Sequence, residues 1–263
     1  MDGQIRYELL EPHPAGLCCP NCGAEHPVVD GVPLVMRNLD AWLATEAAVV
    51  FARRDLPEAT AARLMRGAGG SLPREAQLVR AYRDAPPSPL HERVAAWISA
   101  QPGLFLELGC GLGVGGDVAQ DRRIGLDLSF SMARAYPGRG LVGDALDPPF
   151  EAGRLDNVLL LNVLDSCRDP RVLLAQADAL LRPGGGMLIS CAWAWHDEVT
   201  PVAARITPDQ LHRALAGDRR ALGLTLGYTV EALEDPVIWR LRAGPRTIHE
   251  HSVMLIALRK SAE

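Results

Sequence analysis

The second half of the chain alternates short apolar runs with longer segments of helical periodicity. The apolar runs predict strands at 104–108, 123–127, 139–142, 155–161 and 186–191. The segments around them predict helices at 90–100, 114–120, 129–135 and 169–181. Strands that alternate with helices in this way are typical of a parallel sheet with helices on both faces.

The end of the chain continues this sheet. Its pattern predicts a helix at 208–216 and two strands, near 228–234 and 249–258. We expect these two strands to close one edge of the sheet as an antiparallel pair. The fold class predicted for residues 93–263 is therefore α/β, with a doubly wound, Rossmann-like, seven-stranded and mostly parallel sheet.

Two shorter segments precede this domain. Residues 1–37 are apolar and rich in turn-forming residues, with strand-like runs at 4–10 and 28–36 around a CCPNCG motif, and they predict a small β-knuckle. Residues 38–92 carry helical runs broken by Gly and Pro, and they predict a helical cap or linker. We expect these helices to favour a closed ligand pocket.

Composition narrows the classes of protein to consider. The chain has 263 residues, is 48% hydrophobic and has a mean hydropathy of +0.03, which suits one sizeable core with a small appendage. Its net charge of −5 and pI of about 5.8 disfavour a nucleic acid as the main partner, because phosphate binding usually requires a basic surface. No apolar run is long enough to span a membrane, and no secretory signal opens the chain. We therefore expect a cytoplasmic protein whose six cysteines are thiols or ligands.

A glycine-rich turn follows the first predicted strand, in the sequence FLELGCGLG. Its glycines let backbone N–H groups approach a ligand without obstruction by side chains. Asp127 ends the second strand, where a nucleotide-binding βαβ unit has its ribose-binding carboxylate, and Asp144 follows the third strand. Each acid also has a structural interpretation, Asp127 as a helix N-cap and Asp144 as a turn residue.

Together with the segment at 181–185 (Leu-Arg-Pro-Gly-Gly), these motifs make residues 105–191 resemble the core of class I S-adenosylmethionine-dependent methyltransferases. The resemblance implies that the glycine turn holds the methionine part of the cofactor, that Asp127 binds both ribose hydroxyls and that Asp144 binds the adenine amino group. It also implies that the segment after the fourth strand lies beside the adenine and the transferable methyl. The cofactor-binding residues expected on this basis are Glu107, Gly109, Cys110, Gly111, Gly113, Asp127, Leu128, Met132, Asp144, Ala145, Asn162 and Val163.

Two features of the glycine turn depart from this pattern. The gap from Gly113 to Asp127 is short and contains a Gly-Gly pair, so the first helix must be clipped to roughly two turns. Gly111, Gly113 and Gly116 also satisfy the G-x-G-x-x-G spacing of nicotinamide-dependent dehydrogenases. The downstream acids and the segment 182–185 nevertheless favour a methyltransferase.

The N-terminal knuckle carries half of a zinc site. Cys19 and Cys22 have the spacing of zinc ligands and Cys18 and His26 are nearby, but a second C-x-x-C is missing. Residues 8–36 resemble the small half-zinc-ribbon domain of the tRNA-methyltransferase activator type, which implies an often incomplete metal set. Zinc at Cys19 and Cys22 is therefore an alternative to a metal-free knuckle that acts as a lid, a dimer contact or a folding aid, and we favour the metal-free form.

Candidates for the acceptor side of the reaction follow the fourth and fifth strands, where open α/β sheets hold their ligands, and precede the last strand. Asp165 and His196 are the candidate general bases, which are needed only when the acceptor must lose a proton. The residues expected to contact the substrate are Trp193, Trp195, Asp197, Arg240 and Arg242. The structural alternatives are a helix cap for Asp165, a plain loop residue for His196 and a solvated surface for the arginines.

These features favour an enzyme that transfers a methyl group from S-adenosylmethionine to an O, N or S atom of a small metabolite, such as an amino-acid-derived compound or a natural product. The knuckle suggests an alternative, a methyltransferase that acts on tRNA or rRNA. A third interpretation is a cofactor-binding scaffold without methyl transfer. If the knuckle is a dimer contact, the protein is a homodimer.

Overall fold

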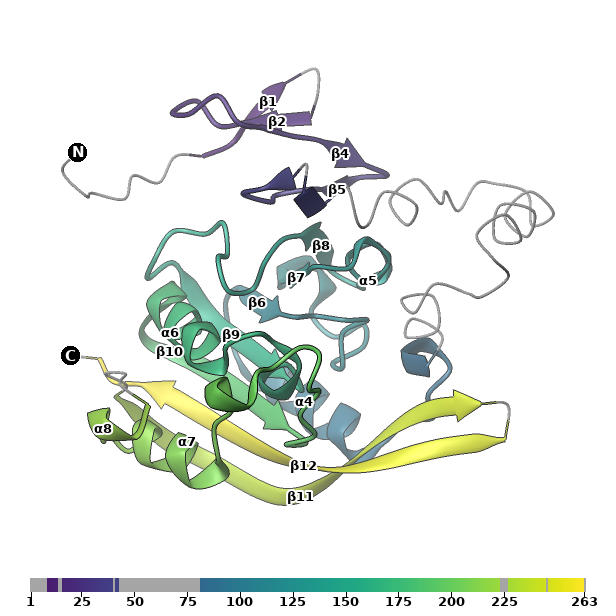
Figure 1. Cartoon of the computed structure of the whole chain (residues 1–263), viewed down its shortest axis with the longest axis vertical. Helices are drawn as coiled ribbons and strands as arrows, with labels where there is room; N and C mark the ends of the chain where they lie inside the picture. The colour runs from purple at the N-terminus through teal and green to yellow at the C-terminus, as the bar shows by residue number, and fades with distance from the viewer. Residues whose placement is uncertain are drawn as a thin grey trace.

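The computed structural model describes residues 9–13, 16–39, 41–42, 81–222, 227–244 and 246–262. A seven-stranded sheet forms its centre, with strand order β11-β12-β10-β9-β6-β7-β8 (Figure 1). The strands are β6 (Phe105–Leu108), β7 (Arg123–Asp127), β8 (Arg139–Val142), β9 (Leu155–Leu161), β10 (Leu181–Cys191), β11 (Tyr228–Gly244) and β12 (Thr247–Lys260). The predicted α/β class with a mostly parallel sheet is confirmed.

The topology of the sheet determines where a ligand can bind. From β6 the chain moves outward through β7 to β8, and then returns to the other side of β6 to form β9 and β10. The pairs among these five strands are parallel, whereas β12 is antiparallel to both of its neighbours, β10 and β11. Because the direction of winding reverses between β6 and β9, their carboxyl ends open a crevice, the usual ligand site of such sheets.

Helices cover both faces of the sheet (Figure 1). They are α4 (Pro89–Ala100), α5 (Phe130–Ala135), α6 (Pro170–Leu180), α7 (Pro208–Leu215) and the short α8 (Arg219–Leu222). Their starts follow local capping chemistry: the side chains of Ser129, Asp169 and Thr207 each accept a backbone N–H in the first turn of α5, α6 and α7. Among the described helices, none is long and apolar enough to cross a membrane.

The helix predicted at 114–120 is wrong. This stretch is a series of turns that ends in a single 3-10 turn, η1 (Gln120–Arg122). Gly116 and Ala119 have left-handed backbones, with φ of +56° and +52°, and a Cβ at Gly115 would lie 2.5 Å from Cδ1 of Ile98. The Arg123 guanidinium donates to the carbonyls of Gly116 and Val118, which would otherwise accept helical hydrogen bonds.

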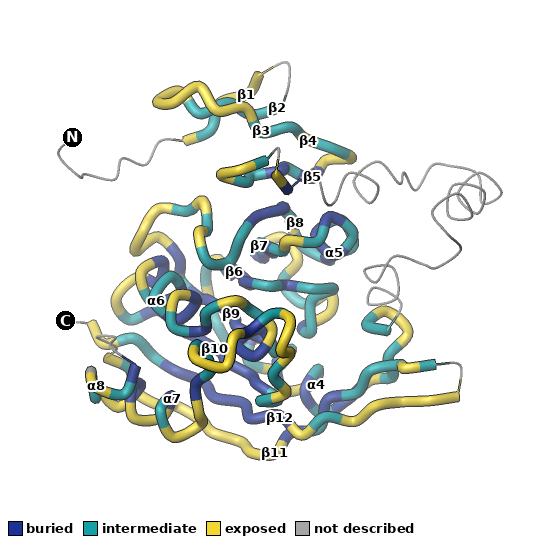
Figure 2. Tube along the Cα trace, viewed as in Figure 1, coloured by how far each residue is buried: buried dark blue, intermediate teal, exposed yellow. Residues whose placement is uncertain are grey.

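The last three strands are longer than the pattern predicted. β10 begins at Leu181 rather than at 186, because Leu181 pairs with Leu155 before an irregularity that spans the Pro-Gly-Gly segment. β11 and β12 form a hairpin whose far end projects beyond the rest of the sheet (Figure 1). Along β11, residues 229–236 are exposed, whereas Val237 and Trp239 are buried (Figure 2).

The described part of the N-terminal knuckle contains five short strands, β1 (Glu11–His13), β2 (Gly16–Cys18), β3 (Glu25–His26), β4 (Val28–Val29) and β5 (Val32–Pro33). The predicted run at 28–36 is divided into β4 and β5 by a turn at Asp30 and Gly31, both of which have positive φ. Residues 4–8 of the other predicted run, and most of the predicted cap at 38–92, lie outside the described residues.

The knuckle lies against the β8 edge of the sheet (Figure 1). Leu34 forms a parallel bridge with Val142, and the N–H of Val35 donates to the Val142 carbonyl at 2.8 Å. Leu34 and Trp42 join Phe130 and Val142 in a buried apolar cluster, and the Trp42 indole N–H donates to the Leu128 carbonyl at 3.0 Å. The N-terminal segment therefore covers an edge that would otherwise expose unpaired backbone groups.

Replacement of Leu34 with alanine should loosen this contact. Leu34 is 1% exposed, and loss of a buried leucine side chain costs about 2–5 kcal/mol. We expect the amide of Val35 to exchange hydrogen much faster in this variant, as measured by hydrogen–deuterium exchange. Leu9→Ala is the matched control because Leu9 is 91% exposed. Equal exchange rates at Val35 in the two variants would contradict the docking of this segment.

Candidate functional site

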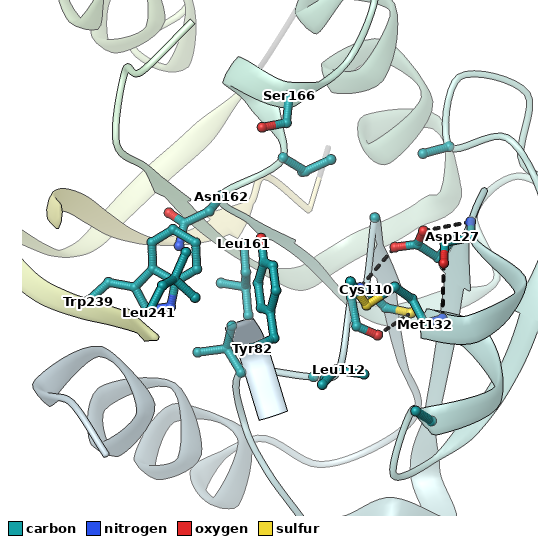
Figure 3. A pocket seen from close by; sticks show the side chains of 18 of the residues that line it. Tyr82, Cys110, Leu112, Asp127, Met132, Leu161, Asn162, Ser166, Trp239 and Leu241 are labelled. Atoms are coloured by element: carbon teal, nitrogen blue, oxygen red, sulfur yellow. Dashed lines mark hydrogen bonds between the residues drawn. The ribbon is translucent and has the colours of Figure 1, made fainter. Parts of the chain in front are cut away.

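A cavity of about 810 Å³ opens at the carboxyl ends of β6, β7 and β9. This volume is in the range of small-molecule sites. Figure 3 shows two ends of this cavity: Cys110, Asp127 and Met132 lie at one end, and Tyr82, Leu161, Trp239 and Leu241 lie at the other. We call the first the cofactor end, because it holds residues that the sequence predicts to bind the cofactor, and the second the acceptor end.

The glycine turn borders the cofactor end. Gly109, Gly111 and Gly113 have φ of +67°, +50° and +78°, a region that side-chain-bearing residues rarely adopt. A Cβ at Gly109 would lie only 2.4 Å from Cγ2 of Val163. The turn therefore depends on glycine for its backbone conformation and for its close approach to the segment after β9.

Asp127 joins the glycine turn to the start of α5. Its Oδ2 accepts the N–H of Gly111 at 2.9 Å, and its Oδ1 accepts the N–H of Ser129 at 2.9 Å (Figure 3). The N-cap of α5 is Ser129, not Asp127. Asp127 also lines the cavity, and a carboxylate oxygen is the kind of acceptor that ligand hydroxyls require.

Asp144 lies in the lining of the same cavity. Its Oδ1 accepts the N–H of Leu146 at 2.9 Å, and its Oδ2 forms an ion pair with Arg168. Arg168 also lines the cavity and is a residue that the sequence analysis did not identify. No motif marks it, because Asp144 and Arg168 are 24 residues apart and meet only where the segments after β8 and β9 come together.

Asn162 contributes an unused hydrogen-bond donor. Its backbone has φ of +52°, and its Oδ1 accepts the Ser190 hydroxyl at 2.9 Å. Its Nδ2 is buried and has no partner among the described residues, although Asn162 lines the cavity. Because a buried N–H group without a partner is costly, this amide fits a site that a polar ligand completes.

Most of the cofactor-binding residues expected from the sequence come together here. Those that line the cavity are Gly109, Cys110, Gly111, Gly113, Asp127, Leu128, Met132, Asp144, Ala145, Asn162 and Val163. Glu107 is outside the lining: it is 1% exposed, and its Oε2 accepts from the Arg123 guanidinium and the Tyr136 hydroxyl, each at 2.8 Å. Glu107 is therefore a buried residue of β6, next to the glycine turn in the chain, and does not line the cavity.

The acceptor end is aromatic and apolar. The rings of Tyr82 and Trp239 lie 5.7 Å apart and are tilted by 51°, and Leu161 and Leu241 lie beside them (Figure 3). Burial, and then the charges of Asp127 and Asp165, raise the pKa of the Tyr82 hydroxyl to about 12, so it remains protonated at neutral pH. The sequence analysis gave neither Tyr82 nor Trp239 a role in the site, because the two residues are far apart in the chain.

The expected acceptor-side residues lie mainly outside the cavity. Asp165 is 3% exposed and accepts the N–H of Ala194 at 2.8 Å, whereas His196 is exposed on the loop after β10, and neither lines the cavity. Asp169, rather than Asp165, caps α6. The position of Asp165 therefore restrains the loop that follows β10.

Of the five residues expected to contact the substrate, only Arg240 lines the cavity. The rings of Trp193 and Trp195 lie 6.3 Å apart and pack against the apolar core that contains Leu160 and Ile189. Asp197 forms an ion pair with Arg205. Arg240 lines the cavity and pairs with Glu250. Arg242 donates to the Asp84 carbonyl outside the lining.

The knuckle cysteines do not form a ligand cluster within the part of the chain that the structure describes. There, no group of three or more His, Cys, Asp or Glu side chains is placed to hold a metal ion. Cys19 is half-buried and Cys22 is exposed.

One protein-family model matches part of the chain. Residues 106–189 match the family model of a methyltransferase domain, and the matched segment runs from β6 to β10. No curated protein matches the sequence significantly.

Several solved structures are similar to the chain at a distance. One, from a study of the conversion of a disulfide bond into a thioacetal group during echinomycin biosynthesis, is 20% identical over 67% of this chain and 83% of its own, with a TM-score of 0.48. A Thermotoga maritima methyltransferase, described as a possible histamine N-methyltransferase, is 15% identical over 76% and 97%, with a TM-score of 0.42. The geranyl diphosphate C-methyltransferase of Streptomyces coelicolor A3(2) is 16% identical over 65% and 79%, with a TM-score of 0.43.

Proposed function

We propose that this protein is a class I S-adenosylmethionine-dependent methyltransferase that acts on an O, N or S atom of a small metabolite. The observation that carries the proposal is the pairing of the glycine turn with Asp127, inside a segment that matches a methyltransferase-domain family. The cofactor would supply an electrophilic methyl group, so the main task of the protein is alignment rather than strong acid–base catalysis.

The residues at the cofactor end suit the parts of this cofactor. Asp127 would accept the two ribose hydroxyls, and Asp144, held by Arg168, would accept from the adenine amino group. The side chains of Leu128, Met132 and Ala145 would give an apolar contact for the adenosine. The glycine turn would present its backbone N–H groups to the methionine part.

A small acceptor suits the other end of the cavity better than a nucleic acid does. The acceptor end is lined by Tyr82, Trp239 and Leu241, which fit a compact and largely apolar molecule. The net charge of −5 does not favour phosphate-rich partners. A tRNA or rRNA substrate is therefore the second candidate.

The test begins with isothermal titration of S-adenosylmethionine and S-adenosylhomocysteine, followed by measurement of S-adenosylhomocysteine formed with a panel of small metabolites and with total tRNA. Binding with turnover of a metabolite supports the proposal. Turnover with tRNA alone favours the second candidate, and binding without turnover favours a scaffold. Absence of binding would overturn all three.

Gly109→Ala should weaken cofactor binding about tenfold or more. A distortion of the turn that costs about 1.4 kcal/mol is enough to lower the affinity tenfold. The added methyl would collide with Val163. Gly153→Ala is the matched control: Gly153 has nearly the same φ, +68°, but a Cβ there meets nothing within 4 Å. Titration of S-adenosylhomocysteine into both variants measures the difference, and equal affinities would contradict the assigned turn.

A further inference from the structure

One histidine faces the cavity from α4. The described residues include all seven histidines of the chain, and among them only His91 lines the cavity. It lies in the first turn of α4, directly after Leu90, which packs in the same apolar cluster as Tyr82, Leu161 and Trp239. Pro87, four residues earlier, also lines the cavity and accepts from Arg240, the residue after Trp239, which places His91 at the acceptor end.

The ring of His91 is held by its neighbour at the helix start. Its Nδ1 lies 2.7 Å from the Ser88 hydroxyl, and Ser88 is 2% exposed. When Nδ1–H donates to this oxygen, Nε2 carries the free lone pair of the neutral imidazole. Burial lowers the pKa of His91 below its usual value, so the ring is neutral and able to accept a proton at neutral pH.

The segment that carries His91 is tied to the strand that carries Trp239. Arg240 donates to the Pro87 carbonyl at 3.3 Å, and Arg242 donates to the Asp84 carbonyl at 2.7 Å. These bonds bring β11 against the start of α4. These hydrogen bonds therefore hold the rings of Tyr82 and Trp239 and the His91 imidazole on one surface of the cavity.

The tyrosine and cysteine side chains that line the cavity are poorly suited to accept a proton. The Tyr82 hydroxyl, with its pKa raised to about 12, is already protonated. Burial raises the pKa of the Cys110 thiol well above its usual value and that of Cys167 to about 12, so both remain thiols. A thiol or phenol that keeps its proton cannot act as a base.

The carboxylates of the lining are at the cofactor end. Asp127 accepts two backbone N–H groups, and Asp144 is paired with Arg168. Asp117 is exposed in the turns that follow the glycine segment. By position and protonation, His91 is the group best placed to act on an acceptor that lies against Tyr82 and Trp239.

We propose that His91 is the general base of this site and that the acceptor is a phenol-type hydroxyl whose ring packs against Tyr82 and Trp239. The inference rests on the proposed methyltransferase function. Flat aromatic rings pack favourably against such side chains, and general bases of this kind typically contribute 10²–10⁴-fold to the rate. His91 takes the place that the sequence analysis gave to His196.

The proposed step is a proton transfer coupled to methyl transfer. The O–H bond of the acceptor breaks, and its proton forms an N–H bond with His91. The oxygen forms a bond to the methyl carbon while the carbon–sulfur bond breaks and its electron pair goes to sulfur. The products are an aryl methyl ether, S-adenosylhomocysteine and an imidazolium that loses its proton to water.

The experiment compares wild type, His91→Gln and His212→Gln, the last being a matched control at an exposed histidine on α7. Calorimetry first measures binding of S-adenosylhomocysteine, and then of 4-chlorophenol to that complex. Turnover is next measured with 4-chlorophenol and with 4-nitrophenol, at a pH where the nitrophenol is ionised and the chlorophenol is not.

We expect both ligands to bind all three proteins equally. His91→Gln should lower kcat for 4-chlorophenol by about 10²–10⁴-fold and for 4-nitrophenol by only a few-fold, because the ionised phenol needs no base. Equal losses with both phenols, no loss with either, or no binding of phenol would overturn the inference. Failure of S-adenosylhomocysteine to bind wild type would instead overturn the proposed function.

Discussion

Replacement of Arg123 with alanine is expected to lower the free energy of unfolding by about 3–5 kcal/mol. Arg123 is fully buried, and its guanidinium donates to Glu107, to the Tyr136 hydroxyl and to the carbonyls of Gly116 and Val118. Its loss would leave the Glu107 carboxylate buried without a counter-charge. Removing one partner of a buried ion pair is strongly destabilising, because the remaining charge stays buried and uncompensated. Urea denaturation followed by circular dichroism measures the change.

Two further variants separate charge from packing at this site. Arg37→Ala removes an arginine whose side chain is 83% exposed and whose ion pair with Asp147 is on the surface, so about 1 kcal/mol or less is expected. A double variant, Arg123→Met with Glu107→Leu, removes both buried charges and should recover part of the lost stability. If Arg123→Ala cost no more than Arg37→Ala, the buried network would not support the fold as described.

Replacement of Asp127 with alanine is expected to weaken S-adenosylhomocysteine binding roughly 10- to 150-fold. Loss of one charged hydrogen-bonding group costs about 1.5–3 kcal/mol, and 1.4 kcal/mol corresponds to tenfold in affinity. The glycine turn also loses the acceptor of the Gly111 N–H, which adds to the effect. Isothermal titration measures the affinity.

Asp127→Asn keeps one side-chain oxygen as an acceptor and should therefore lose less affinity than the alanine variant. Asp209→Ala removes an aspartate whose side chain is 77% exposed on α7 and serves as the control. A thermal melt of each variant separates loss of binding from loss of fold. Unchanged affinity in Asp127→Ala would remove the ribose role from this residue.

The elements predicted well from the sequence are those whose determinants are local. β7, β8 and β9 have the predicted bounds, because each is an apolar run bounded by turn-forming residues. The start of α6 follows from Asp169 and the proline after it, which form an N-cap and first helical position. The glycine turn and Asp127 could be recognised because consecutive residues and a strand end define them.

The elements predicted poorly depend on residues distant in the chain. The helix expected at 114–120 is replaced by turns because Arg123 binds their carbonyls and Ile98 leaves no room for a side chain at 115. The acceptor end was missed for the same reason: Tyr82, His91 and Trp239 meet only when β11 packs against the segment that precedes α4.

By itself, the sequence determined the order of strands and helices, the class of the sheet and the position of the glycine turn, because hydrophobic period, capping and glycine placement act over a few residues. Only the tertiary structure decided which side chains share the cavity. It placed His91 and Arg168 in the lining, left His196 and Asp165 outside it, and put Glu107 beneath the turn. Side-chain neighbours across a fold are set by packing between elements, which periodicity along the chain does not encode.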